Sequence, residues 1–394
     1  MPTLSSVPSA SSRTPGASHR RRIGVVSTFP PQLCGLATFA SALADSLQEA
    51  GHIVDRVCVD DGSGAGSGGS GFAAVLKNGV HASIGRVAGA LSHCDAVIVQ
   101  HEYGIYGGAD GDEVLDLLST LTVPTIVVLH TVPLVPTPHQ REVLERVCAV
   151  ADGVVVMSQA AHDRLLDLYT VDAHDVAVIS HGATLAAPGT GADGDEVPEL
   201  LTWGLIGPGK GIEHAIDAVA ILHKSGVAAR YTVAGVTHPK VFAARGDVYR
   251  HSLIRRAEDN GVSRSVVFDD SYRTVPELTR FVASATVIVL PYDSRDQVTS
   301  GVLIDAVAAG RPVIATAFPH AVEMLGSGAG VVVPHGDPDA LADAIRTVLV
   351  DGDVCAGMAA EAQRLAPTLS WASVAAAYVH LSRRLTPQGA RIAI

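Results

Sequence analysis

The sequence predicts an α/β fold made of two doubly wound parallel sheets. From residue 22 onward, short runs of β-branched residues alternate with amphipathic helical stretches, which is the pattern of parallel strands joined by crossover helices. The same rhythm restarts after a polar, glycine-rich segment at 187–196, and such segments form loops or linkers. A chain of 394 residues is also long enough for two domains that each have a core.

This alternation places the elements in order along the chain. In the first half we expect helices at 37–50 and 139–150, among others, and strands at 22–28, 53–59, 96–100, 125–130, 153–158 and 176–180. In the second half we expect strands at 200–206, 230–235, 265–269, 287–291, 312–316 and 330–333. A short apolar helix at 302–309 and a last helix at 371–384 complete the set.

The domain boundaries follow from the same pattern. The residues before the first strand are rich in Ser and Pro and contain no acid, a composition typical of disorder. We therefore predict a disordered tail at 1–21 and a linker at 187–197. The two domains are expected at 22–186 and 198–370, with a helix and a tail at 371–394.

Composition excludes several classes of function. A net charge of −12 argues against nucleic-acid binding, which needs concentrated basic surface. The five cysteines are scattered without C-x-x-C spacing, which favours reduced thiols in the cytoplasm over disulfides or a zinc site. No run approaches the ~20 apolar residues of a membrane span. Peripheral contact with a membrane and the oligomeric state stay open.

Three Asp-x-Asp pairs could suggest a divalent metal. They are Asp110/Asp112, Asp193/Asp195 and Asp351/Asp353. Each reads Asp-Gly-Asp, and both residue types are favoured in turns for local backbone reasons. We interpret the pairs as turns and predict no metal site.

The most informative segment is 290–323. A buried strand ends near Leu290 and a small-residue turn opens the apolar helix at 302–309. A helix start of this kind presents unpaired N–H groups and the positive end of the helix dipole, which suits a phosphate. Gln297 precedes the turn, and Asp305 lies eight residues later. An ordinary strand–loop–helix unit remains the alternative for these residues alone.

The segment resembles the donor-binding signature of GT-B glycosyltransferases of family 4, E-x7-E followed by A-x-A-x-G-x-P-V. The two acidic positions fall on Gln297 and Asp305, and the eight residues after Asp305 match the tail. The resemblance implies that Asp305 hydrogen-bonds the nucleotide ribose and that Gln297 contacts hydroxyls of the donor sugar. It also implies that the N–H groups of Ser300, Gly301 and Val302 bind the diphosphate.

The segment at 203–211, WGLIGPGKG, resembles the G-R-L-x-x-x-K-G loop of the same family. It implies that Lys210 binds the diphosphate and that Gly209 belongs to the donor-binding loop. The family arginine is replaced by Leu205. Arg273 and Arg295 are candidates for the missing positive charge.

Polar residues that follow three strands of the first half complete the expected site. Gly35 lies in a loop that resembles the family's glycine-containing donor loop. His101, Glu102 and Tyr103 end the third expected strand and are candidate sugar or acceptor contacts, through hydrogen bonds and ring stacking. His130 ends the fourth expected strand, and the resemblance implies a contact with the transferred sugar. Each of these segments is also compatible with a plain loop.

The resemblance covers nearly the whole chain after residue 22 and implies a GT-B fold, in which two Rossmann-like domains face each other across a cleft. It implies a retaining, metal-independent transfer of a mannose- or glucose-type hexose from a GDP- or UDP-sugar to a glycan, lipid or small-molecule acceptor. Lys210, Gln297 and His130 are the expected catalytic residues, and no other cofactor is expected. The alternatives are a weakened homologue that binds a nucleotide sugar or glycan, and a GT-B epimerase or phosphorylase.

Overall fold

A computed structural model describes residues 20–32, 34–60, 71–186 and 197–385. The predicted tail at 1–21 lies outside the described residues except for Arg20 and Arg21. Most of the predicted linker, the pair Asp193/Asp195 and the last nine residues also lie outside them.

The described part of the first half forms a seven-stranded sheet in which every strand pair is parallel. The strands, in spatial order, are β3 (Ala74–Lys77), β2 (Ile53–Asp60), β1 (Arg22–Ser27), β4 (Ala96–His101), β5 (Thr125–Leu129), β6 (Gly153–Val156) and β7 (Val176–Val178). The central strands are buried on both faces, so they read as continuous apolar runs such as the start of β4.

The described part of the second half forms a six-stranded parallel sheet with the same winding. Its strands, in spatial order, are β10 (Val266–Asp269), β9 (Arg230–Ala234), β8 (Glu199–Trp203), β11 (Val287–Leu290), β12 (Val313–Thr316) and β13 (Gly330–Val333). The predicted architecture of two doubly wound parallel sheets is therefore confirmed.

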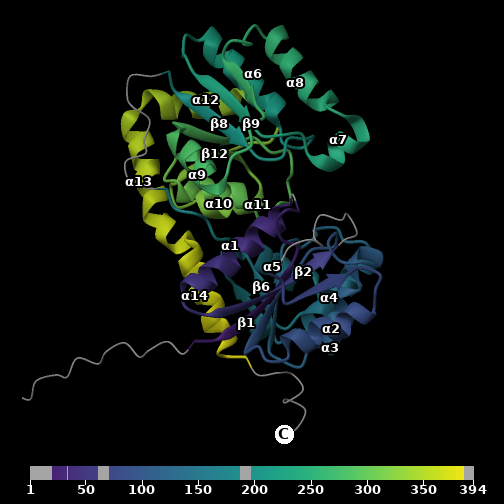
Figure 1. Cartoon of the computed structure of the whole chain (residues 1–394). Helices are drawn as coiled ribbons and strands as arrows, with labels where there is room; N and C mark the ends of the chain where they lie inside the picture. Colours follow the sequence, from purple (N-terminus) through teal and green to yellow (C-terminus); the bar gives the residue numbers. More distant parts are fainter. Residues whose placement is uncertain (1–19, 33, 61–70, 187–196, 386–394) are drawn as a thin grey trace, which may run out of the picture.

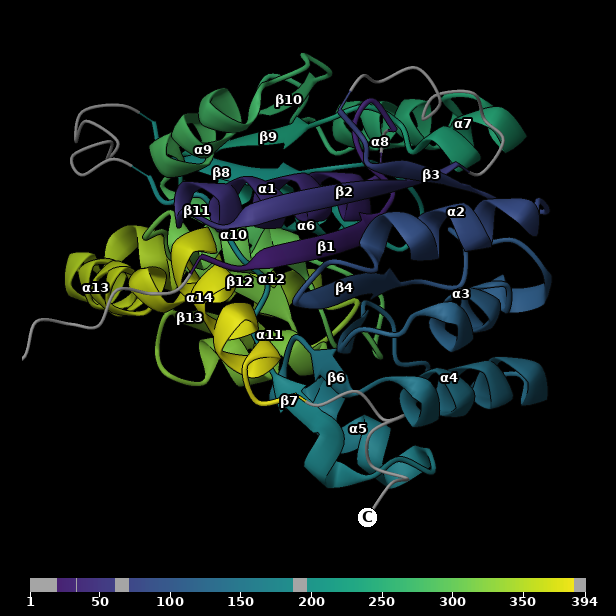
Figure 2. The same cartoon turned by 60° about the horizontal axis from the view of Figure 1, so that its bottom comes forward.

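Helices cover both faces of each sheet (Figures 1 and 2). Those of the first half are α1 (Gly35–Glu49), α2 (Ala82–Leu91), α3 (Val114–Thr120), α4 (Pro138–Val150) and α5 (Gln159–Leu168), with 3-10 turns η1 (Ala109–Gly111) and η2 (Ala173–Asp175). Those of the second half are α6 (Ile212–Lys224), α7 (Pro239–Arg245), α8 (Val248–Asp259), α9 (Val275–Ser284), α10 (Gly301–Ala308), α11 (Pro319–Leu325), α12 (Pro338–Val350), α13 (Gly352–Leu369) and α14 (Trp371–Ser382). None of the helices in the described ranges is long and apolar enough to cross a membrane.

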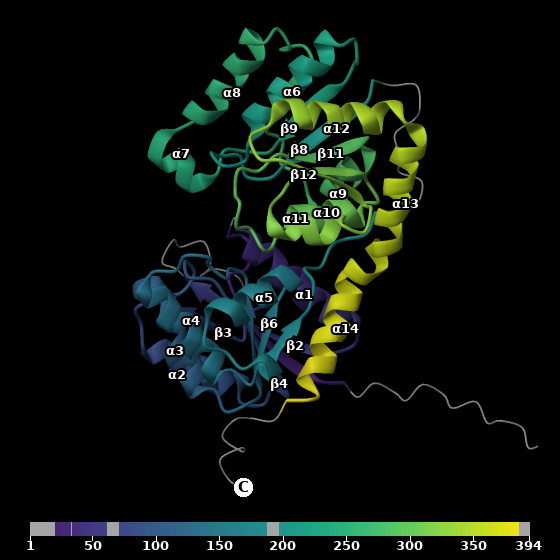
Figure 3. The same ribbon diagram turned by 180° about the vertical axis from the view of Figure 1, so that it is seen from behind.

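The chain returns to the first domain at its end. Figure 3 shows α13 running along one side of the second domain and α14 lying against the first. Four residues of α14 belong to the core on one face of the first sheet: Val374, Ala375, Tyr378 and Val379. The predicted last helix is confirmed as α14, which ends two residues early.

The sequence missed one strand and misplaced several ends. The missed strand, β3, has only four residues and lies at the edge of the sheet, where a single residue, Leu76, is fully buried. A strand this short carries too little alternation to be recognised. The helix expected at 302–309 begins one residue earlier, at Gly301.

Candidate active site

The loops that carry the expected site residues follow the strands at which each sheet reverses its order. This reversal lies between β1 and β4 in the first sheet and between β8 and β11 in the second. Open α/β sheets bind ligands beyond the carboxyl ends of their strands at such points. Loops from these ends of the two sheets contact each other, for example where Ser158, after β6, donates a hydrogen bond to Val298, after β11.

The start of α10 has two N–H groups available for a ligand. Ser300 is the N-cap, and its Oγ accepts from Leu303 N (3.3 Å). The N–H of Ser300 itself donates to His320 Nδ1 (2.9 Å), so in this structure it is already paired, and its contact with the diphosphate stays a prediction. The N–H groups of Gly301 and Val302 have no hydrogen-bond acceptor in the described part of the chain.

Lys210 lies in the loop between β8 and α6 and is half-buried. Its Nζ lies 4.2 Å from the centre of the Tyr292 ring, which in turn stacks on Phe318. Burial lowers the pKa of its ammonium group, and no carboxylate within the described ranges pairs with it. An ammonium group that is partly desolvated and lacks a counterion is suited to an anionic ligand.

Two glycines allow the Lys210 loop to take its path. Gly209 has φ +88°, a left-handed conformation that other residues rarely adopt. Gly211 has φ +61°, and a Cβ there would lie 1.7 Å from the carbonyl oxygen of Pro291. The loop is therefore pressed against the chain that leaves β11, and Asp293 N donates to Gly209 O (3.0 Å).

Asp305 lies in the second turn of α10 and is half-buried. Burial raises the pKa of its carboxyl group to about 7. Across the described residues its carboxylate accepts no hydrogen bond. Burying a carboxylate without a hydrogen-bond donor is unfavourable. A ligand hydroxyl group that donates to Asp305 would remove this cost and so favour binding.

Gln297 is half-buried in the loop before α10. Its Nε2 donates to Thr299 O (3.0 Å), which leaves the side-chain oxygen as its remaining polar atom. This oxygen has no donor in the described part of the chain. Gln297 can therefore accept a hydrogen bond from a sugar hydroxyl, as a carboxylate would, without adding a negative charge.

In the first domain, His130 directly follows β5. Its Nε2–H donates to Gln100 Oε1 (2.6 Å), so Nδ1 is the acceptor of the ring. Burial and the neighbouring His181 and His101 lower the pKa of His130 to about 3. The ring is therefore neutral at physiological pH.

His101, the last residue of β4, and the two residues that follow it have different environments. His101 is fully buried and neither of its ring nitrogens has a partner, so a direct ligand contact by this ring needs its neighbours to move. Glu102 is half-buried and accepts from Thr131 Oγ1 (2.5 Å), while burial raises the pKa of its carboxyl group. The hydroxyl group of Tyr103 donates to Gln140 O (3.2 Å), so this polar atom is already used within the domain.

Gly35 begins α1 in open surroundings. No atom lies within 4 Å of where its Cβ would be. The preceding residue, Cys34, caps the helix by accepting from Ala37 N (3.4 Å) and lies 3.2 Å from Thr28 Oγ1. Cys34 is therefore held by local contacts, and no described residue fills the space beside Gly35.

Comparison with known proteins decides the family. A family model described as Glycosyltransferase Family 4 matches residues 34–186, and one described as Glycosyl transferases group 1 matches residues 197–351. The chain belongs to the family 4 (group 1) glycosyltransferases of the GT-B fold. The resemblance found in the sequence is confirmed.

Similar proteins carry related descriptions. The D-inositol 3-phosphate glycosyltransferases of Corynebacterium glutamicum and Kineococcus radiotolerans are each 29% identical, over 239 and 276 residues, or 57% and 63% of this chain. The matches span 56% and 61% of those two relatives. The crystal structure of HepE from Anabaena in complex with UDP has a TM-score of 0.72 at 16% identity, over 92% of this chain and 100% of that one, a likeness that shows the fold.

One family cation is absent from this chain, where Leu205 takes its position, and the two sequence candidates differ in their surroundings. Arg273 is paired with Asp269 and lies over the ring of Phe281, and Arg295 is exposed. Arg250 was not singled out from the sequence. Its Nη1 donates to Gly235 O (2.7 Å), and Gly235 packs against Gly204, the neighbour of Leu205.

His181, which lies three residues after β7, was not among the expected site residues. Its Nδ1–H donates to Gly182 O (2.7 Å), and its Nε2 lies 2.9 Å from where a Cβ on Gly301 would be. Phe39 and Trp371 pack against its ring. The glycine that opens α10 is therefore also required for close approach of the first domain.

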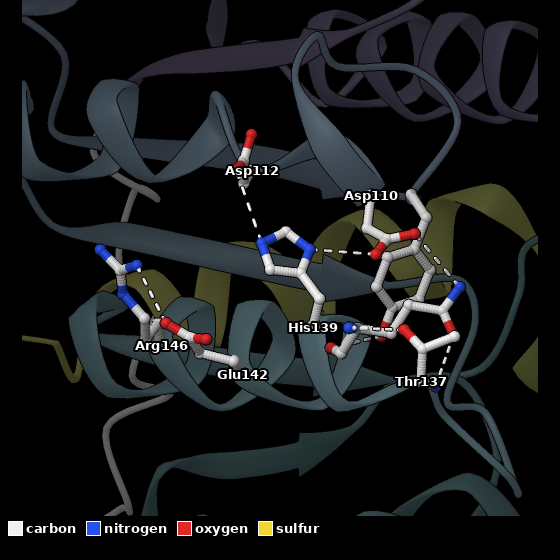
Figure 4. Close-up of polar contacts among 8 residues, drawn as sticks. Asp110, Asp112, Thr137, His139, Glu142 and Arg146 are labelled. Carbon is white, nitrogen blue, oxygen red and sulfur yellow. Dashed lines mark hydrogen bonds and ion pairs between the residues drawn. The ribbon is translucent and has the colours of Figure 1, made fainter.

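The pair Asp110/Asp112 belongs to a turn that is fixed to α4 (Figure 4). His139 Nδ1 lies 3.0 Å from Asp110 Oδ2, and Nε2 lies 3.7 Å from Asp112 Oδ2. Figure 4 shows the two carboxylates on opposite sides of the imidazole ring. Asp110 has φ +49°, a left-handed conformation that Asp tolerates in turns. No three His, Cys, Asp or Glu side chains in the described ranges are placed to hold a metal ion.

Proposed function

We propose that this family 4 glycosyltransferase transfers a hexose from a nucleotide-diphosphate sugar to a hydroxyl group of an acceptor, with retention of configuration and without a metal ion. Two features carry the proposal. One is the ammonium group of Lys210, which has no counterion among the described residues. The other is the set of N–H groups at the start of α10 that have no acceptor there. The β8 loop and α10 are neighbours, because a Cβ built on Gly204 would lie 3.9 Å from Val302 Cγ2.

These groups match the charge that develops during transfer. When the bond between C1 of the sugar and the diphosphate oxygen breaks, negative charge grows on the leaving diphosphate. Donors that are already oriented toward that position lower the barrier, because they need no rearrangement during the reaction. The acceptor hydroxyl attacks the same face of C1, and its proton passes to the leaving diphosphate.

The remaining roles follow from the polar groups described above. Asp305 accepts from the ribose hydroxyls, and the side-chain oxygen of Gln297 accepts from a hydroxyl of the donor sugar. His130 stays neutral and offers Nδ1 or its carbonyl oxygen to the sugar, with Glu102 nearby on the acceptor side. Gly35 leaves room for the donor at the start of α1.

UDP-glucose is the first donor to test, since HepE was solved with UDP and with UDP-glucose. An inositol phosphate is the first acceptor to test, since the relatives are described as D-inositol 3-phosphate glycosyltransferases. GDP sugars, and glycan or lipid acceptors, are the next choices.

The test is a thermal-shift and calorimetry panel of UDP, GDP, ADP and their hexose conjugates in EDTA, on the wild type and on Lys210→Met. A ligand that binds the folded state raises the melting temperature by mass action. The proposal expects a shift with one diphosphate and its sugar, most of it lost in the variant. Transfer to the acceptor, followed by proton NMR of the product, then reports the anomer. Absence of a shift with every nucleotide would refute the proposal and favour a glycan-binding homologue.

A further inference from the structure

The loop that carries Gln297 belongs to the second domain but is held by the first. Ser158 Oγ donates to Val298 O (2.5 Å), and Arg164 Nη1 donates to Asp296 O (2.7 Å). Both donors belong to α5 of the first domain or to its N-cap. The carbonyl groups on either side of Gln297 are therefore fixed by side chains from across the domain interface.

The side chain of Val298 strengthens this attachment. It is 5% exposed and belongs to the core cluster on one face of the first sheet, together with residues such as Val132 and Leu165. Burial of an apolar side chain away from water is favourable, so this contact holds the loop against the first domain. The loop is thus anchored in the hydrophobic core of the neighbouring domain directly beside Gln297.

A carboxylate of the second domain caps the same helix. The two oxygens of Glu323, on α11, accept from Gln159 N and Ala160 N, each at 2.8 Å. A carboxylate at a helix N-terminus is stabilised by unpaired N–H groups and by the helix dipole. Two N–H groups in the first turn of α5 therefore find their acceptors only when the domains are together.

The helix α11 also holds Gln297 from its own domain. His320 N donates to Gln297 O (3.3 Å), and His320 Nδ1 accepts from Ser300 N (2.9 Å). The backbone carbonyl groups of residues 296, 297 and 298 therefore all accept hydrogen bonds. The donors to residues 296 and 298 lie in the first domain, and the donor to residue 297 lies in the second.

We infer that Arg164, Ser158 and Glu323 are positioning residues for Gln297, so that the first domain completes the sugar-contacting part of the donor site. The diphosphate contacts at Lys210 and α10 lie within the second domain and do not depend on these residues. The inference rests on the proposed function, since it assigns Gln297 to the donor sugar. It makes binding of the sugar moiety, and not of the nucleotide, sensitive to the domain interface.

Two variants test the inference: Arg164→Met, which keeps the apolar stem, and Glu323→Gln, which removes the charge and keeps one acceptor oxygen. Calorimetry gives the affinities of each for UDP and for UDP-glucose. Arg164→Met is expected to weaken UDP-glucose binding about tenfold, the scale of one lost hydrogen bond from a charged donor, and to leave UDP binding within about twofold, because its diphosphate contacts are intact. Glu323→Gln is expected to have a smaller effect of the same kind.

The matched controls are Arg86→Met and Glu49→Gln, which change exposed residues on α2 and α1. Both are expected to leave the ratio of the two affinities unchanged. The Arg164→Met change is then made in a Gln297→Ala background, where it should have no further effect on UDP-glucose binding, since residues that act through one contact are not additive.

Equal losses for UDP and UDP-glucose, or full additivity with Gln297→Ala, would overturn the inference and leave α5 with a purely structural role. In that case the wild type still binds the donor, and the proposed function stands. If the wild type bound neither ligand nor any other nucleotide of the panel, the proposed function and the inference would fail together.

Discussion

The buried carboxyl group of Asp305 should make the unliganded protein less stable than a variant without it. Burial raises the pKa of Asp305 from 3.8 to about 7. A group whose pKa is higher in the folded state binds protons more tightly there, so stability falls as pH rises from the unfolded pKa to the folded one and then stays low. The cost is therefore small below pH 4 and complete above pH 7.

The magnitude follows from the size of the shift. A rise of about three pKa units corresponds to about 4 kcal/mol in the folding free energy at pH 8. Asp305 is only half-buried, and solvent screening reduces this figure, so we expect about 1–3 kcal/mol. Asp305→Asn keeps the shape of the side chain and removes the ionisation, and it should be more stable than the wild type by this amount at pH 8.

The assay is urea unfolding of the two unliganded proteins at pH 5 and pH 8, followed by circular dichroism. The difference in unfolding free energy in favour of Asp305→Asn should be larger at pH 8 than at pH 5. The variant should also bind the donor at least tenfold more weakly, because an amide accepts from a ribose hydroxyl less strongly than a carboxylate does. Asp167→Asn, at an exposed position of α5, is the control for loss of a surface charge. A variant less stable than the wild type at pH 8, or an advantage independent of pH, would refute the argument.

Substitutions at three further positions, Lys210, Gly301 and Tyr292, have defined outcomes. Lys210→Ala should lower turnover by about 10²–10³, the scale for losing one preorganised donor to a developing charge, and steady-state kinetics within a few-fold of wild type would contradict its role. Gly301→Ala places a Cβ 2.9 Å from His181 Nε2. This overpacking should lower the free energy of unfolding in urea by about 1–3 kcal/mol. The control Gly85→Ala, in α2, meets no described atom within 4 Å and should leave stability unchanged or raise it. Tyr292→Phe removes a buried hydroxyl group that has no hydrogen-bond partner among the described residues, so it should not lower the melting temperature. Tyr292→Leu removes the aromatic ring that Lys210 contacts, so it should weaken donor binding measured by calorimetry.

The sequence predicted the fold well because the signals that decide it are local. Each central strand is a short run of apolar residues, and several helix starts carry their own capping residue, as at Ser158 and Ser300. The order of such units and the rule that ligands bind at the carboxyl ends of the strands were enough to predict that Lys210 and α10 follow neighbouring strands, β8 and β11. Sequence also gave the correct location of Asp305, although not the rise of its pKa.

What sequence reasoning missed came mainly from contacts between residues that are distant along the chain. The N–H of Ser300 is taken by His320, twenty residues later, and no local pattern encodes that hydrogen bond. His101 was a different case, since strand alternation puts it on the same face as Val97 and Val99. Both valines belong to the core cluster of that face, so its burial could have been predicted. The attachment of Val298 to the first domain depends on how the two domains meet, which a single sequence does not reveal.

The two departures from the family motif offset each other in charge. Leu205 replaces an arginine and removes a positive charge from the diphosphate loop, while Gln297 replaces a glutamate and removes a negative charge near the sugar. Coulomb energies between groups a few ångströms apart are large in a partly desolvated site, so a loss of either charge alone would change the field that acts on the donor. Losing both leaves the net charge of the motif unchanged, with Lys210 as the cation and the hydrogen-bond acceptor of Gln297 retained. Arg164 and Ser158 fix the carbonyl groups on both sides of Gln297. The two substitutions are therefore compatible with the proposed donor site, because together they leave its net charge unchanged and retain a hydrogen-bond acceptor at Gln297.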